Sequence, residues 1–131
     1  MIRYWSNDYA PLSSDRCSCG RTHVRAIGGI VGRHDDLVVF KGAKFYPSQV
    51  EKVVRSFAEL SDEFRIEVDA GGGTLVERCT VVCELRDAGA EVEQRLVRAL
   101  RAELGVTPGL RVESHGSLER FAFKAQRLVR L

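Results

Sequence analysis

Two stretches with apolar residues at helical spacing constrain the fold of this chain more than any other feature. Residues 47–60 carry one apolar stripe, and residues 92–104 carry a second stripe that Gly105 ends. The stripe residues are Val50, Val53, Val54, Phe57 and Leu60 in the first stretch, and Val92, Leu96, Ala99, Leu100 and Leu104 in the second. Most of the stability of such a helix comes from burying its stripe, so the chain must supply an apolar surface that covers both.

The segment between the two helical stretches has the pattern of a β-hairpin. Residues 64–70 alternate between apolar and polar types, the glycines 71–73 predict the turn, and residues 74–85 form the partner strand. In the partner strand, Cys79, Val81, Cys83 and Leu85 fall on one face. We therefore expect Cys79 and Cys83 to be small core residues under the helices.

Shorter strands precede and follow this central unit. Residues 37–40 and 44–46 are predicted to pair across a turn at Lys41-Gly42, and residues 109–115 form a last strand. The order of elements is hairpin, helix, strand, strand, helix, strand. It predicts an α+β fold with one small, ferredoxin-like sheet, two helices on one face, and a short hinge hairpin in front.

Local signals mark the start of the first helix. Pro47 suits the first helical turn, because its missing N–H would be unpaired there in any case. Ser48 and Glu51 stand three places apart, which is the spacing of a capping box. The first helix is therefore predicted to begin at about these residues.

Composition and charge argue against several classes of function. The net charge is only +2, and basic and acidic residues are interleaved, so no nucleic-acid partner is expected. No run approaches the roughly 18 apolar residues that a membrane helix needs. The opening MIRYWSNDYAPL lacks the basic and apolar regions of a secretory signal. We expect a cytoplasmic protein with no membrane partner.

Residues 1–31 are dense in Pro, Ser, Asp and Gly and are predicted to be irregular. Their block CSCGRTH brings Cys17, Cys19 and His23 close together in sequence. Two interpretations remain open. In one, these residues bind zinc with further ligands from another domain; in the other, the cysteines only shape a loop beside Gly20. A single residue between the cysteines is tighter than the usual zinc spacing, which weakens the first interpretation.

Three blocks give the chain a family resemblance. They are IRYWSND at residues 2–8, GRHDDLVVFKGAKFYPSQVE at residues 32–51, and FKAQRLV at residues 123–129. Together with CSCGRTH they resemble the C-terminal part of the adenylate-forming (AMP-binding) ligases, in the phenylacetate–CoA ligase branch. The resemblance implies that residues 1–31 are the end of a large domain, and that residues 32–131 are a mobile C-terminal lid domain.

The resemblance also implies roles for individual residues in two half-reactions. A carboxylate first reacts with ATP to give an acyl-adenylate and pyrophosphate, and the lid then rotates so that CoA accepts the acyl group. Asp8 would hold the ribose hydroxyls with help from Arg33, Asp35 would be the hinge, and Lys124 would catalyse adenylation. The loop for the thioester step would comprise Gly42, Ala43, Lys44, Phe45, Tyr46 and Pro47.

These residue types suit that chemistry. A carboxylate accepts hydrogen bonds from two vicinal hydroxyls, and a lysine can meet the charge that develops on phosphorus. A hinge needs a residue that tolerates large φ/ψ changes. One departure from the family pattern is Phe123, because a glycine at that place would let the lysine segment bend more easily.

The phosphate-binding loop and the acid pocket of such ligases belong to a large N-terminal domain that these 131 residues do not contain. ATP with Mg²⁺, CoA and an aromatic or other carboxylic acid are therefore expected only in the complete enzyme, and this chain alone is expected to be inactive. Its partner would be that large domain, in the same or a separate chain. The alternatives are a non-catalytic binding or regulatory module, including a homodimer, and an unrelated α+β domain.

Overall fold

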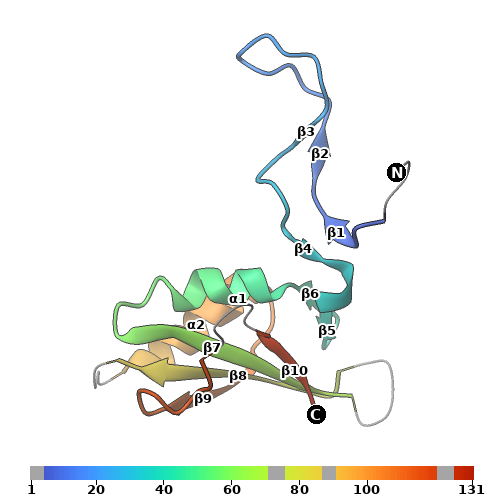
Figure 1. The fold of residues 1–131 in the computed structure, drawn as a ribbon. Helices are drawn as coiled ribbons and strands as arrows, with labels where there is room; N and C mark the ends of the chain where they lie inside the picture. Colours follow the sequence, from blue (N-terminus) through green and yellow to red (C-terminus); the bar gives the residue numbers. More distant parts are fainter. Residues whose placement is uncertain (1–4, 71–75, 87–90, 121–125) are drawn as a thin grey trace.

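The computed structural model describes residues 5–70, 76–86, 91–120 and 126–131. Figure 1 shows a body, in which two helices cover one sheet, and an arm that extends away from it. We call residues 5–33 the arm, and the described residues from 38 onward the body. The elements in chain order are β1 (Asp8–Tyr9), β2 (Leu12–Ser13), β3 (Arg25–Ala26), β4 (Gly32–Arg33), η1 (His34–Asp36), β5 (Val38–Phe40), β6 (Ala43–Phe45), α1 (Pro47–Val54), β7 (Leu60–Asp69), β8 (Arg78–Leu85), α2 (Val92–Leu104), β9 (Gly109–Glu113) and β10 (Leu128–Arg130).

The body is built on a mixed four-stranded sheet in the order β10-β7-β8-β9. β7 and β8 pair antiparallel, with Ile66 opposite Val81, whereas β10 lies parallel to β7 and β9 parallel to β8. The parallel pairing places Leu128 opposite Ile66 at one edge of the sheet. The predicted α+β fold with one small sheet is confirmed.

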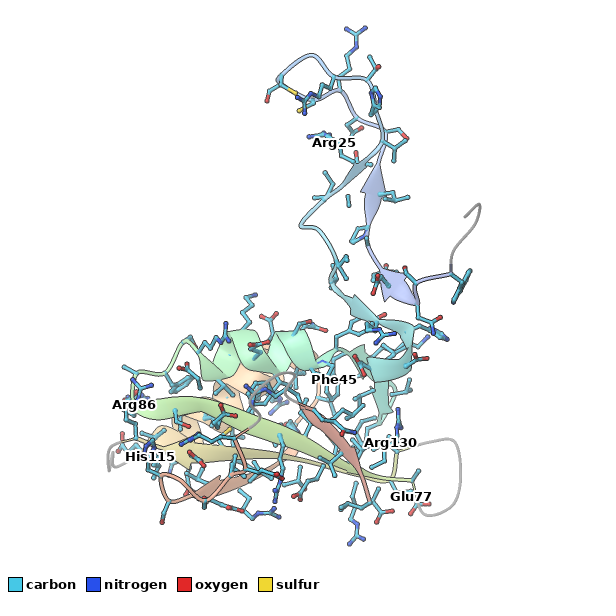
Figure 2. The ribbon with its side chains drawn as sticks, in the orientation of Figure 1. Arg25, Phe45, Glu77, Arg86, His115 and Arg130 are labelled. Carbon is cyan, nitrogen blue, oxygen red and sulfur yellow. The ribbon has the colours of Figure 1, made fainter. Side chains whose placement is uncertain are left out.

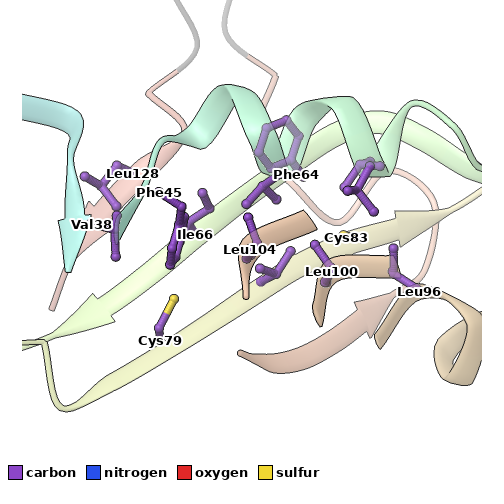
Figure 3. Close-up of a cluster of buried hydrophobic side chains, with 14 of the residues drawn as sticks. Val38, Phe45, Phe64, Ile66, Cys79, Cys83, Leu96, Leu100, Leu104 and Leu128 are labelled. Carbon is purple, nitrogen blue, oxygen red and sulfur yellow. The ribbon is translucent and has the colours of Figure 1, made fainter. Parts of the chain in front are cut away.

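The core lies between the sheet and the two helices (Figure 3). One apolar cluster contains the buried residues of both helices and the alternate residues of β7 and β8, so both helices pack on the same face. Its fully buried members include Phe64, Ile66, Leu96 and Leu100. Cys79 and Cys83 are buried in this cluster as predicted, and burial raises the pKa of the Cys79 thiol to about 11 and that of Cys83 to about 12.

The second helix agrees with the sequence prediction, and the first is shorter than predicted. α2 spans Val92–Leu104 and ends at Gly105, which has a φ of 71° and donates its N–H to the carbonyl of Arg101. α1 ends at Val54, because the Ser56 hydroxyl donates to the carbonyl of Val53 at 2.6 Å and the chain turns toward β7. Phe57 still packs against the core, but Leu60 is the first residue of β7.

The capping box predicted from Ser48 and Glu51 is wrong. The N-cap of α1 is Tyr46, two residues before Ser48, and the side chain of Gln49 accepts the Tyr46 N–H at 3.0 Å. The Ser48 hydroxyl donates instead to the carbonyl of Val31 at 2.7 Å, in the arm. Glu51 pairs with Arg55 at 2.7 Å along the helix. Pro47 is the first helical residue, as expected.

The arm is more regular than the sequence predicted. β1 pairs with β4, which puts Asp8 opposite Arg33, and β2 pairs with β3. Each of these strands has only two residues, too few for an alternating pattern to show. The β1–β4 pairing spans the boundary predicted after residue 31, so that boundary stays a prediction.

Two further expectations concern turns and membranes. The hairpin of β5 and β6 turns at Lys41 and Gly42, whose φ values of 48° and 83° are those of a tight two-residue turn. The turn predicted at residues 71–73 lies outside the described residues. Within the described ranges, no helix is both long and apolar enough to cross a lipid bilayer.

Candidate functional site

The predicted nucleotide and hinge residues meet where the arm joins the body. The Arg33 Nε lies 4.0 Å from a carboxylate oxygen of Asp8, and the Asn7 amide donates to Asp35 at 3.1 Å. The N–H of His34 donates to the carbonyl of Asn7 at 2.8 Å. The Arg33 and Asp35 side chains are exposed, so these contacts contribute little to stability. Asp35 itself is the middle residue of η1.

Asn7 was not singled out from the sequence. It has a φ of 61°, a conformation that asparagine tolerates better than most residues, and this aims its side chain toward Asp35. The available signal in the sequence was the position of this asparagine directly before the predicted nucleotide-binding residue Asp8. The contact itself joins residues 28 positions apart and has no local pattern.

The six residues of the predicted thioester-step loop form an ordered hairpin end. Ala43, Lys44 and Phe45 are strand β6, Tyr46 caps α1, and Pro47 begins it. Phe45 is fully buried in the core, and Figure 2 shows it beside the junction with the arm. Lys44 is exposed on this hairpin.

Tyr46 forms an aromatic junction between the body and the arm. Its ring stacks on Tyr9, with the centroids 5.9 Å apart and the planes at 18°. Gly32 lies so close to the same ring that an added Cβ would fall 2.7 Å from the Tyr46 Cγ. These contacts join the arm to the start of α1, and neither residue pair is visible in a local sequence pattern.

An open cavity of about 690 Å³ lies between η1 and the last strand. It is lined by Arg33, Asp35, Asp36, Pro47 and residues 126–130. On one wall, a guanidinium nitrogen of Arg130 donates to the carbonyl of Asp35 at 3.2 Å (Figure 2). Lys124 and Phe123 lie outside the described residues, but Gln126, two places after Lys124 in the sequence, lines this cavity.

The two cysteines of the arm lie together, with their sulfurs 3.0 Å apart and not joined in a disulfide. The hydrogen bond from the Cys19 thiol lowers the pKa of Cys17. Among the described residues, no group of three or more His, Cys, Asp or Glu side chains could hold a metal ion. Zinc at Cys17, Cys19 and His23 therefore stays a prediction that needs ligands from another domain.

Most of the exposed large apolar side chains of the described residues are on the arm. Trp5 is 82% exposed and Leu12 72% exposed, although both are types that folded domains usually bury. The others on the arm are Tyr9, Val24, Ile27 and Ile30. An apolar surface of this kind is typical of a segment that packs against another domain or chain.

Comparison with known proteins identifies the class. The profile of the AMP-binding enzyme C-terminal domain family matches residues 42–130. The chain belongs to this family. Phenylacetate-coenzyme A ligase from Thermus thermophilus is 35% identical in an alignment 126 residues long, which covers 82% of this chain and 28% of that ligase. The chain thus spans less than a third of the length of this relative.

A 2-hydroxyisobutyryl-CoA ligase gives the structural comparison. Its structure in the postadenylation state with 2-HIB-AMP matches 99% of this chain and 29% of the ligase, with 27% identity and a TM-score of 0.82. The same ligase with 2-HIB-AMP and CoA in the thioesterification state also matches 99% of this chain, and 28% of the ligase, with 26% identity but a TM-score of only 0.62. Because the ligase and the share of this chain are the same, the difference reflects how the matched parts are arranged.

Proposed function

We propose that this chain is the C-terminal lid of an AMP-forming acid–CoA ligase similar to phenylacetate–CoA ligase. In this proposal a complete enzyme activates a carboxylic acid with ATP and transfers the acyl group to CoA. The chain supplies the hinge, the loop for the thioester step and the adenylation lysine, and it is inactive alone. Membership of the AMP-binding C-terminal domain family and the ligase relatives support this assignment.

The observation that carries the proposal is the cavity beside the hinge. It brings Gln126 close to Arg33 and Asp35, although more than 90 residues separate Gln126 from these two in the sequence. A nucleotide next to Asp8 and Arg33 would therefore lie near Gln126, which follows Lys124 by two positions in the sequence. A preorganised cation near the α-phosphate stabilises the charge that grows there in the transition state.

The arm supports a separate large domain as the partner. Trp5, Leu12 and Ile30 expose apolar surface that a larger neighbour would cover. The ligase relative is more than three times as long as the matched part, since this chain covers 28% of it. We infer that residues 1–31 pack on the large domain, whether it belongs to the same or a separate chain, and that residues 32–131 move.

The two orientations follow from the junction. In the present arrangement Tyr46 contacts Tyr9 and Gly32, so the hairpin at residues 42–47 is held beside the arm. The higher similarity to the postadenylation state of the 2-hydroxyisobutyryl-CoA ligase supports an adenylation-side orientation. Rotation at Asp35 would carry the hairpin away from Tyr9 and toward the thioester step.

The test is reconstitution with the large domain of a phenylacetate–CoA ligase. Adding this chain is expected to restore pyrophosphate exchange that depends on ATP, Mg²⁺ and phenylacetate. Lys124→Ala should lower exchange by at least about 100-fold, as expected when one preorganised contact worth about 3–4 kcal/mol is lost. Lys52→Ala is the matched control, because Lys52 lies on α1 and pairs with Glu103. Equal exchange rates for Lys124→Ala and the wild type would favour the non-catalytic binding module instead.

A further inference from the structure

The first turn of α1 makes a side-chain contact with the arm that the proposed function does not use. The Ser48 hydroxyl donates to the carbonyl of Val31 at 2.7 Å, which is an ordinary length for a bond from a hydroxyl to an oxygen. Val31 comes directly before β4, and Ser48 is the second residue of α1 (Figure 1). Ser48 therefore joins the body to the arm directly.

The aromatic junction lies beside this hydrogen bond. Tyr46 precedes Ser48 by two residues, and Gly32 follows Val31 directly. The Tyr46 ring stacks on Tyr9 and lies against Gly32. The same two short stretches of chain, one in the arm and one in the body, thus meet through a hydrogen bond as well as through a ring contact.

The predicted hinge residue Asp35 lies between the two bonded residues in the chain. Val31 comes before Asp35, and Ser48 comes after it. A rotation of the backbone at Asp35 moves everything after it relative to everything before it, so a large rotation must break the bond from Ser48 to Val31. The bonds from Asn7 and Arg130 differ in this respect, because both end on Asp35 itself. The Ser48 bond is therefore specific to one orientation of the body.

The start of α1 does not depend on the Ser48 hydroxyl. A serine at a helix start usually accepts a hydrogen bond from a backbone N–H of the first turn, but Ser48 donates outward to the arm. The N-cap is Tyr46, whose N–H donates to the Gln49 side chain at 3.0 Å. Val50 is fully buried and fixes the same turn on the core. Removal of the hydroxyl should therefore leave α1 in place.

The orientation that this bond belongs to is the one on the adenylation side. The 2-hydroxyisobutyryl-CoA ligase resembles the present arrangement more closely in its postadenylation state than in its thioesterification state. A contact that exists in only one of two conformations adds its free energy to that conformation alone. The bond from Ser48 to Val31 therefore raises the population of the adenylation-side orientation.

We propose that Ser48 is a positioning residue, which favours the adenylation-side orientation of the lid by donating to the Val31 carbonyl. The inference rests on the proposed function, because that function supplies the two orientations and the two half-reactions. Ser48 does not touch substrate in this role. One neutral hydrogen bond changes an equilibrium constant by about 2- to 10-fold, so it biases the two orientations and still lets the lid rotate.

Distances between spin labels on the full chain show whether Ser48 sets the orientation. The labels are attached at two exposed positions, Ser14→Cys on the arm and Ala102→Cys on α2. Both cysteines of the arm are replaced in every sample, as Cys17→Ser and Cys19→Ser, and the two cysteines of the core stay because they are buried. Ser48→Ala should increase the share of a second distance by about 2- to 10-fold relative to the first.

The same comparison is made in a Tyr46→Ala background. This background lacks the ring contact with Tyr9, so the second orientation is more populated and its share is measured more easily.

Reconstitution with the large domain of a phenylacetate–CoA ligase connects the orientation to the two half-reactions. Pyrophosphate exchange depends on the population of one orientation, and thioester formation from supplied phenylacetyl-adenylate and CoA depends on that of the other. The ratio of the two rates therefore follows the orientation equilibrium, whatever its starting value. Ser48→Ala should lower the ratio of exchange to thioester formation by about 2- to 10-fold. Ser48→Thr keeps a hydroxyl and should restore most of it.

Ser56→Ala is the matched control. The Ser56 hydroxyl donates to the carbonyl of Val53 at 2.6 Å, so this bond has the same chemistry as that of Ser48 but lies wholly within the body. The substitution removes one serine hydroxyl without touching the junction with the arm. It should leave both the label distances and the ratio of the two rates at their wild-type values.

Several results would overturn the positioning role. An unchanged ratio in Ser48→Ala refutes it, as do label distances that stay unchanged in both backgrounds, and either result leaves the proposed function intact. An equal shift in Ser56→Ala, or an equal slowing of both half-reactions in Ser48→Ala, indicates a general effect on folding and also refutes it. If the wild-type chain restores no pyrophosphate exchange, the proposed function fails, and the label distances then decide only whether Ser48 sets the orientation.

Discussion

Gly32→Ala offers the sharpest test of the junction between arm and body. A methyl group at residue 32 would lie 2.7 Å from the Cγ and 2.9 Å from the Cε1 of Tyr46, closer than carbon atoms approach in folded proteins. The Tyr46 ring must therefore move, and its stacking on Tyr9 at 5.9 Å is disturbed. Overpacking of this kind costs about 1–3 kcal/mol. The core is unaffected, because Gly32 lies outside it.

Amide hydrogen exchange measures this cost at the junction. The N–H of Val31 donates to Tyr9 and that of His34 to Asn7, so both report opening of the β1–β4 pairing. Because about 1.4 kcal/mol corresponds to a factor of ten, their exchange should accelerate by about 5- to 150-fold. The N–H of Ile66, which donates to Arg127 in the body, should exchange at its original rate.

A double-mutant cycle separates the clash from other effects of the methyl group. In a Tyr46→Ala background the ring is gone, so adding Gly32→Ala should have almost no further effect on the exchange of Val31 and His34. The reasoning is wrong if the acceleration is just as large without the ring. It is also wrong if Gly32→Ala alone leaves both amides unchanged, since the ring would then have room that the structure does not give it.

Two further predictions concern titratable groups. At mildly alkaline pH, iodoacetamide should alkylate Cys17 well before Cys79 and Cys83. A neighbouring thiol lowers the pKa of Cys17, whereas burial raises the pKa values of Cys79 and Cys83 to about 11 and 12. Peptide mass spectrometry gives the order of labelling, and early labelling of Cys79 or Cys83 in folded protein would contradict this prediction. Burial alone would raise the pKa of Glu84, but the hydrogen bonds from the Leu118 N–H and other donors outweigh it. Because the pKa of Glu84 is lower folded than unfolded, its ionised form stabilises the fold above the ordinary value of 4.5, and this contribution is lost as the pH falls through the folded pKa. The difference in unfolding free energy between wild type and Glu84→Gln should therefore shrink in acid, and a constant difference would contradict the assignment.

The sequence was a good guide where the pattern was long and local. α2 combines thirteen residues of helical spacing with Gly105 at its end, and its bounds agree with the prediction. α1 is shorter than predicted because the Ser56 hydroxyl donates to the carbonyl of Val53. Phe57 and Leu60 keep helical spacing in the sequence, so the apolar pattern does not show this earlier end. The spacing of apolar residues indicates which side chains are buried, but not whether the backbone there is helical. Phe57 packs on the core and lies outside the helix.

Elements that depend on distant partners were missed. β10 has three residues, and it is a strand only because it lies beside β7, more than 60 positions earlier in the chain. No local pattern distinguishes Leu128–Arg130 from the basic tail around it. The two-residue strand pairs of the arm were not predicted for the same reason, because these strands are defined by their pairing and not by their composition.

The candidate site also has a part that the sequence predicted and a part that it did not. Asp8, Arg33 and Asp35 were singled out by resemblance, and the structure brings them into one neighbourhood. The contacts of Tyr46 with Tyr9 and of Arg130 with Asp35 could not be foreseen, because they join aromatic and charged groups that have no common motif. The roles of all these residues, and that of Lys124, stay predictions.

The bond from Arg130 to Asp35 has a mechanical consequence. Its acceptor is the backbone carbonyl of Asp35, not the carboxylate, so any substitution that keeps the peptide bond leaves the acceptor in place. Turning the peptide plane at Asp35 swings this oxygen away from the guanidinium. In the proposed rotation at Asp35, the end of β10 would therefore be released from Asp35 as the peptide plane turns, and a spectroscopic label near the carboxyl end of β10 would report that release.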